Sequence, residues 1–132
     1  MEVVRVSSNG ELDDAFANLS QERIEALVVS PGQLFGNRAD LAALAARHAI
    51  PKMYYDREFA AVGGLISYGS DLADQYYETG LYTGRVLKGE KPVDMPVMQA
   101  TKFELVINLA TANSLRLEVP ATLLAHADEV IE

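Results

Sequence analysis

Short apolar runs that alternate with amphipathic stretches constrain this sequence more than any other feature. The runs lie at residues 3–6, 26–30 and 51–55, and the stretches between them, at residues 11–19 and 38–48, carry apolar side chains at helical spacing. Strands that alternate with helices in this way pair in parallel, because a tight turn cannot join parallel neighbours. The first half of the chain is therefore predicted to be an α/β unit with an open parallel sheet and flanking helices.

The pattern changes in the second half of the chain. It predicts a strand at 65–68, a long helix at 71–87, a strand at 103–109, a short helical segment at 111–115 and a last helix at 120–130. Asp71 can cap the long helix, and Gly89 suits the left-handed position that ends it. Inside that helix, Gly80 and Gly84 would allow another backbone to approach closely.

Composition and motifs argue against several classes of function. The chain has 11 Lys and Arg against 19 Asp and Glu, a net charge of −8, which disfavours a nucleic-acid partner. It has no cysteine, and its two histidines, His48 and His126, lack metal-ligand spacing, so we expect neither a metal site nor another cofactor. No phosphate loop or nucleophile motif is present, which disfavours an enzyme. No apolar run approaches the roughly 20 residues that span a bilayer.

Five ordered sequence blocks in the second half carry a family resemblance. They are residues 63–69 (GGLISYG), 87–92 (LKGEKP), 95–97 (MPV), 101–109 (TKFELVINL) and 127–131 (ADEVI). In this order they resemble the C-terminal half of the TrpX-like ABC transporter substrate-binding proteins. The resemblance implies a type I periplasmic-binding-protein fold, in which two α/β lobes joined by three chain crossings hold a small organic solute between them.

The resemblance also implies a division of the chain. Residues 1–64 would form the core of the second lobe, and residues 65–94 a hinge strand and a helix that belongs to the first lobe. Residues 95–132 would form the return crossing and the C-terminal helices. A complete member has both lobes, so this chain is expected to be a C-terminal fragment or a truncated paralogue. An uncovered helix would then need a partner, and we expect a homodimer.

Two functional hypotheses follow. The first is a noncatalytic, partial solute-binding component of an ABC importer, whose intact relatives bind a small organic solute such as an amino acid and meet an ABC permease; binding by this chain would be weak or absent. The second is a structural or protein-interaction module without solute binding. The intact family is periplasmic or lipid-anchored, whereas a natural product without a leader would stay in the cytoplasm.

The carboxyl ends of the predicted parallel strands are where a ligand would sit. The candidate ligand-binding residues in these loops and in the hinge are Ser30, Gln33, Phe35, Tyr55, Asp56, Arg57 and Tyr68. Asp56 and Arg57 suit the two ends of a zwitterion, and an aromatic residue suits a flat solute. The alternative is that Asp56 and Arg57 are a solvated pair at a helix start, with Phe59 in the core. The tyrosines Tyr76, Tyr77 and Tyr82 are expected to be interface residues.

Overall fold

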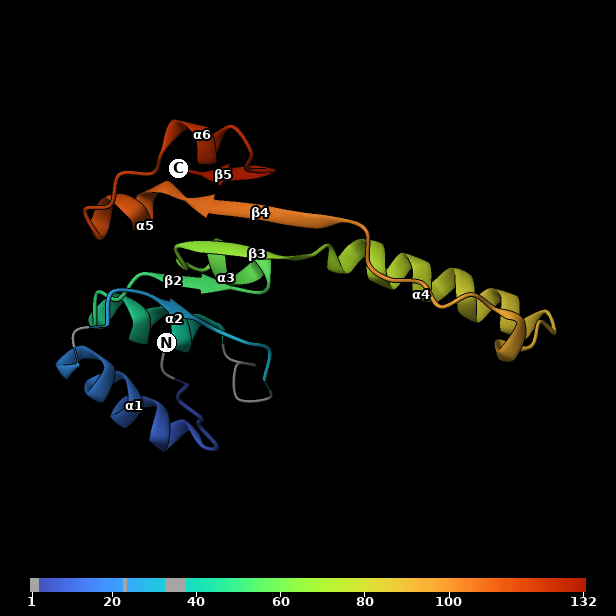
Figure 1. The fold of residues 1–132 in the computed structure, drawn as a ribbon, viewed down its shortest axis with the longest axis horizontal. Coiled ribbons are helices and arrows are strands. Elements are labelled where there is room, and N and C mark those ends of the chain that lie inside the picture. Colours follow the sequence, from blue (N-terminus) through green and yellow to red (C-terminus); the bar gives the residue numbers. More distant parts are fainter. Residues whose placement is uncertain (1–2, 23, 33–37) are drawn as a thin grey trace.

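A computed structural model describes residues 3–22, 24–32 and 38–132, and it consists of a body and a projecting arm (Figure 1). The body holds a sheet of five strands in the order β1 to β5. These are β1 (Leu27–Val28), β2 (Lys52–Tyr54), β3 (Ile66–Ser70), β4 (Phe103–Asn108) and β5 (Glu129–Ile131). The first three are mutually parallel, β4 is antiparallel to β3, and β5 is parallel to β4. The predicted α/β class is confirmed, with the return strand and its neighbour running in the opposite direction.

Three helices cover one face of this sheet. They are α1 (Asn9–Gln21), α2 (Arg38–Arg47) and α3 (Arg57–Ala61). Their apolar side chains meet those of β1 and β2 in one core, formed by Phe16, Val29, Leu41, Leu44, Tyr54 and Phe59. The rings of Tyr54 and Phe59 stack at 4.5 Å between centroids, which fixes α3 against β2.

A lysine lies on the same face as this core. The Lys52 side chain, on β2, is 2% exposed, and its Nζ lies 4.0 Å from the centroid of the Phe16 ring of α1. Among the described residues Nζ has no hydrogen-bond partner. Burial without a counter-ion lowers the pKa of Lys52 to about 7.

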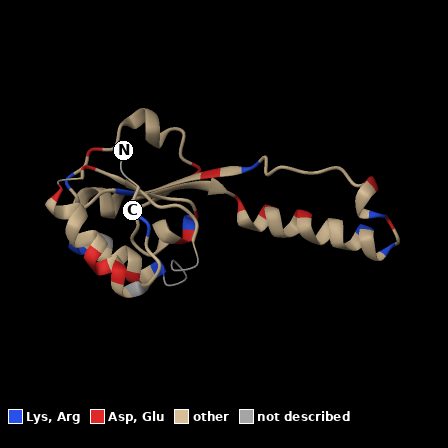
Figure 2. Ribbon diagram, turned by 60° about the horizontal axis from the view of Figure 1, so that its bottom comes forward, with Lys and Arg blue, Asp and Glu red and all other residues tan. Residues whose placement is uncertain are grey.

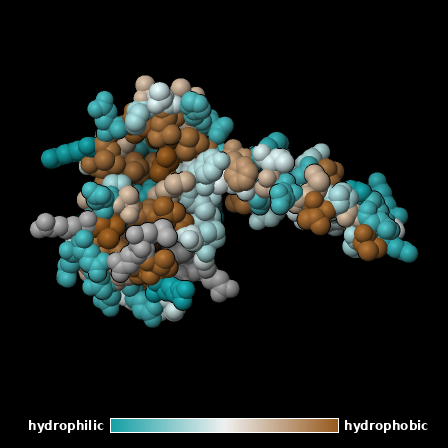
Figure 3. All heavy atoms as spheres, in the orientation of Figure 1, coloured by the Kyte–Doolittle hydropathy of each residue, from teal (hydrophilic) through white to brown (hydrophobic). Residues whose placement is uncertain are grey.

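The other face of the sheet is only partly covered. Side chains alternate between the faces of a strand, so Val28, Tyr68 and Phe103 lie on the face opposite the three helices. Val28 is 72% exposed, and Tyr68 and Phe103 are each 49% exposed. In the space-filling view of Figure 3, apolar side chains gather on the body. The body is therefore a two-layer structure with apolar surface left open.

The arm comprises α4 (Leu72–Leu87), the 3-10 turn η2 (Pro92–Asp94) and a return segment, residues 95–102, that runs back to β4 (Figure 1). The Asp71 side chain caps α4 by accepting from the Asp74 N–H, as predicted. Gly89 ends the helix with φ +97°, also as predicted. None of the sixteen residues of α4 is buried.

Several expected elements differ from the structure. Residues 3–6 form no strand, since no neighbouring strand pairs with them. The expected helix at 120–130 is wrong beyond its first turn: α6 (Ala121–Leu124) is followed by β5. Asp128 explains this, because its N–H donates to Leu105 O and its carboxylate accepts from Leu105 N–H, which joins the segment to β4. The short helix α5 (Leu109–Ser114) is confirmed. The helix start that the alternative interpretation placed at Asp56 and Arg57 is confirmed as the start of α3, with Phe59 buried in the core.

Candidate functional site

One edge of the sheet collects most of the candidate residues. The carboxyl ends of β1, β2 and β3 and the amino ends of β4 and β5 lie at this edge, because β4 and β5 run in the opposite direction. The arm leaves from the same edge (Figure 1). We call it the arm-side edge. In open α/β sheets such an edge is where ligands bind.

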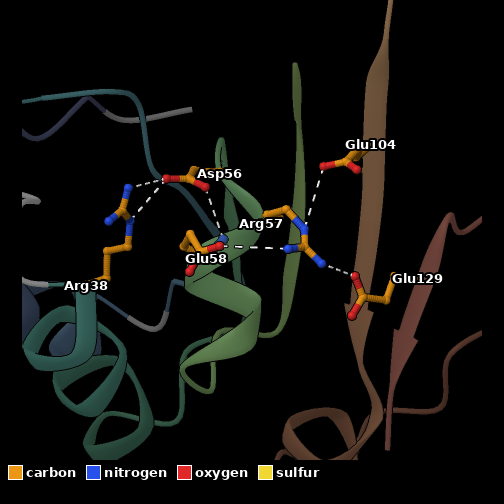
Figure 4. A network of polar contacts seen from close by, with 6 residues as sticks. All are labelled: Arg38, Asp56, Arg57, Glu58, Glu104 and Glu129. Carbon is orange, nitrogen blue, oxygen red and sulfur yellow. Dashed lines mark hydrogen bonds and ion pairs between the residues drawn. The ribbon is translucent and has the colours of Figure 1, made fainter. Parts of the chain in front are cut away.

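Asp56 lies at the arm-side edge immediately after β2. Its carboxylate caps α3 by accepting from the Glu58 N–H at 3.0 Å, and it accepts from Arg38 Nη2 at 2.6 Å and from Arg38 Nε at 3.1 Å (Figure 4). The Asp56 side chain is 2% exposed and that of Arg38 is 39% exposed. The hydrogen bond to Asp56 raises the pKa of Arg38. Asp56 and Arg38 thus form an ion pair that is half-buried: the carboxylate is buried and the guanidinium is partly exposed.

Arg57 connects α3 to the last two strands. Its guanidinium pairs with Glu129 of β5, and lies 3.7 Å from a Glu104 carboxylate oxygen on β4 and 3.8 Å from one of Glu58 (Figure 4). The hydrogen bond to Glu129 is the main cause that raises the pKa of Arg57. Arg57 therefore meets three carboxylates, and its side chain remains 44% exposed.

Tyr55 lies between the core and β3. Its ring contacts that of Phe59 edge-on at 5.6 Å. Its backbone carbonyl lies against Gly69 of β3, where an added Cβ would fall 1.8 Å from the oxygen. Gly69 is therefore required for the loop after β2 to lie this close to β3.

Ser30 and Tyr68 complete the predicted set within the described residues. Ser30 follows β1 and is exposed. Tyr68, in β3, stacks on Phe103 of β4 with centroids 5.7 Å apart. The predicted residues Gln33 and Phe35 lie outside the described residues. The structure thus brings Tyr55, Asp56 and Arg57 to the arm-side edge, while Tyr68 faces the open side of the sheet.

Four residues that lie in this region were not among the candidates predicted from the sequence. Arg38 could have been suspected, since it starts the helix that follows the β1 loop. Phe103 and Glu104 open a strand that was predicted, but only the antiparallel register places them beside Tyr68 and Arg57. Glu129 could not be found, because its segment was expected to be helical.

The charges of the edge limit what it can bind. The four carboxylates Asp56, Glu58, Glu104 and Glu129 surround only two guanidinium groups, Arg38 and Arg57. An excess of carboxylate favours an ammonium group over a phosphate. Across the described residues, no group of three or more His, Asp or Glu side chains is placed to hold a metal ion.

A groove of about 480 Å³ runs along the arm, between α4 and the return segment. Tyr82 bridges it by donating its hydroxyl hydrogen to Pro96 O at 2.8 Å. Asp74 and Glu78 line it from the helix, and Val97 and Met98 from the return segment. The groove is separate from the arm-side edge, which holds the ion pairs described above.

Comparison with known protein families identifies the family of the chain. The family model for ABC transporter substrate binding proteins matches residues 1–131. The chain belongs to this family. No curated protein sequence matches it. Within the described parts of this family member, no helix is both long and apolar enough to cross a membrane.

Solved structures resemble the chain over nearly all of its length. An ABC domain from Streptococcus pneumoniae, in complex with L-Trp, is 27% identical with a TM-score of 0.88, and the match covers 98% of this chain. A conserved domain protein from Vibrio cholerae is 20% identical over 92% of the chain with a TM-score of 0.82. A ligand-free, open substrate-binding protein with adhesive properties from Clostridium difficile is 20% identical over 96% with a TM-score of 0.65. The chain spans only 44%, 41% and 42% of these three chains.

Proposed function

We propose that this chain supplies one wall of a binding cleft for a small organic solute, such as an amino acid, in an ABC import system, without catalysis. The family match over residues 1–131 supports a substrate-binding role. The Streptococcus pneumoniae structure that holds L-Trp suggests an aromatic amino acid as the first solute to test. The importer role implies an ABC permease partner and a location outside the cytoplasmic membrane.

The observation that carries the proposal is that the arm and the candidate residues share one edge. A ligand at the arm-side edge would meet Tyr55 and the carboxylates around Arg57, while α4 extends past it. We infer that residues 65–94 belong to a first lobe, which would close the cleft from the opposite side. The ammonium group of the amino acid would lie near Glu104 or Glu129. The ring of Tyr55 would contact a flat side chain of the ligand.

A cleft with only one wall binds weakly, so the test must detect millimolar affinity. Amide chemical shifts of the isotope-labelled chain are followed as L-Trp, L-Leu and L-Glu are added separately, up to about 10 mM. We expect L-Trp to shift the amides of Ser30, Tyr55, Asp56 and Arg57, with L-Glu giving the smallest effect because of the local carboxylate excess. The substitution E104Q should weaken the shifts, and E78Q, in the arm groove, should not. Absence of shifts with all three amino acids would overturn the proposal, and shifts confined to the arm groove would move the site there.

The exposed arm favours a second candidate, a protein-interaction module. With no residue of α4 buried, a partner surface is the simplest reason to keep the helix. A titration without shifts, combined with stable self-association, would favour this candidate over solute binding.

A further inference from the structure

Lys102 lies at the junction between the body and the arm and contacts both. It directly precedes β4, and its backbone carbonyl accepts from the Asp71 N–H at 3.1 Å, which adds one more link beyond the paired ends of β3 and β4. The backbone of Lys102 is therefore fixed to the body. Its side chain forms an ion pair with Asp74, in the first turn of α4. One residue thus holds the sheet through its backbone and the helix through its side chain.

The local charges favour this ion pair. The Asp74 side chain is 20% exposed and that of Lys102 is 65% exposed, so the carboxylate is the less solvated partner. The hydrogen bond to Asp74 raises the pKa of Lys102, and the negative charges of Asp71 and Glu78 act in the same direction. In Figure 2 the acidic residues of α4 lie along the side of the helix that faces the return segment. Three carboxylates at the start of the helix therefore attract the ammonium group of Lys102.

The start of α4 is the point at which the arm could change direction. The helix begins directly after its N-cap, Asp71, and a rotation about the backbone dihedral angles there would swing the whole arm. Farther out, Tyr82 donates its hydroxyl hydrogen to Pro96 O, a contact that holds the arm to itself and not to the body. The pair between Asp74 and Lys102, in contrast, spans the junction and opposes such a rotation.

We propose that Lys102 is a positioning residue, whose side chain sets the direction of the arm relative to the body by holding Asp74. Its role in binding rests on the proposed function, because in that cleft the direction of α4 decides how far the opposite wall lies from Tyr55 and Asp56. The contacts of Lys102 lie on the side of α4 that faces the return segment. They do not involve the other side of the helix, which a first lobe would cover.

Distances between two spin labels on the 132-residue chain test the proposal. The sequence has no cysteine, so the labels attach only at A17C, in α1 of the body, and at L81C, in α4, both exposed positions. The variants K102Q and D74N remove the ion pair, and the control R85Q removes an ion pair within the arm. Loss of an exposed ion pair changes a two-state population by about two- to fivefold. We therefore expect the fraction of molecules outside the main distance to rise by about this factor in K102Q and D74N, and not in R85Q.

Two further variants separate positioning from a general loss of structure. K102R keeps the positive charge and should restore the wild-type distances, and the double variant K102Q/D74N should broaden them no more than either single one, since both remove the same contact. Helix content and the urea midpoint should stay at the wild-type values, because α4 keeps its cap at Asp71.

Unchanged distances in K102Q and D74N would overturn the proposal, and so would equal broadening in R85Q or K102R. The labels report on the arm with no amino acid present. This test and the amino-acid titration can therefore fail separately.

Discussion

Gly69 of β3 lies in direct contact with the backbone carbonyl of Tyr55, with room for no side chain between them. This contact joins the strand that leads into the arm to the loop that carries Asp56 and Arg57. A shift of either segment must move the other or open a gap, because both are part of the packed body. A displacement of the loop that carries Asp56 and Arg57 is therefore expected to displace β3, which leads into the arm, at Gly69.

The substitution G69A tests this connection. Its Cβ would fall 1.8 Å from Tyr55 O, so the loop or the strand must move, and we expect the free energy of unfolding to fall by about 3 kcal/mol. The control is G10A in α1, where an added Cβ meets nothing within 4 Å and the change should be neutral or stabilising by up to about 1 kcal/mol. Urea unfolding measures the free energy of unfolding of both variants. Equal values for G69A and G10A would contradict the close contact at Gly69.

The substitution R38M tests the half-buried ion pair. It leaves the Asp56 carboxylate 2% exposed and without its cation, so we expect a loss of about 2 kcal/mol, less than for a fully buried pair because Arg38 is partly solvated. The matched control is R85M, which removes a pair between two exposed side chains and should cost less than about 1 kcal/mol. The prediction fails if chemical denaturation gives the two variants the same stability.

Asn108 links β4, α3 and α5, and its substitution should be costly. Its side-chain amide donates to Ala60 O at 3.0 Å, and its side-chain carbonyl accepts from the Thr111 N–H at 2.9 Å. We expect N108A to lose about 2 kcal/mol, since it removes the cap of α5 and one of the donors to the Ala60 carbonyl, which keeps the Gly63 N–H. S114A, which removes an exposed hydrogen bond to Thr111 O, should change stability by less than about 0.5 kcal/mol. Comparable thermal unfolding of both variants would contradict these roles.

Lys52 should make stability depend on pH. Its pKa is about 7 in the folded chain and near 10.4 in the unfolded chain, so between these values the unfolded state binds more protons and stability rises with pH. Below pH 7 the charge must be buried in the folded state, and stability is lowest. The rise corresponds to about 1.4 kcal/mol per pKa unit, reduced to the extent that the Phe16 ring stabilises the ammonium group.

The substitution K52M removes the titrating group and keeps an unbranched side chain that is one atom shorter. We expect K52M to be more stable than the wild-type chain near pH 7 and to lack the rise toward pH 9. K102M serves as the control, because Lys102 is exposed and paired with Asp74. Parallel stability profiles for wild-type and K52M between pH 7 and pH 9 would show that Lys52 is not the cause.

The sequence was most informative where local signals and tertiary contacts agree. The helical spacing of residues 71–87, the cap at Asp71 and the stop at Gly89 predicted α4 almost to the residue, since a projecting helix depends on its own propensities. The prediction for segment 127–131 was wrong. The segment pairs with the free edge of β4 as a strand, and no local sequence pattern reveals that contact. Within the candidate site, Asp56 and Arg57 were predicted from their place after a strand, and both form ion pairs at the arm-side edge. Their partners Arg38, Glu104 and Glu129 come from elements that only the fold brings together.

The register of β3 and β4 has a consequence for how the molecule can be divided. Ser70 and Phe103 are cross-strand neighbours, so the chain leaves the sheet and returns to it at adjacent positions. Topologically, everything from residue 71 to residue 102 is the loop of one long hairpin, and a two-residue turn such as Asn-Gly could close the same pair of strands. Replacing the arm by such a turn would break none of the β3–β4 pairs, so none of the strand pairings of the body depends on the arm.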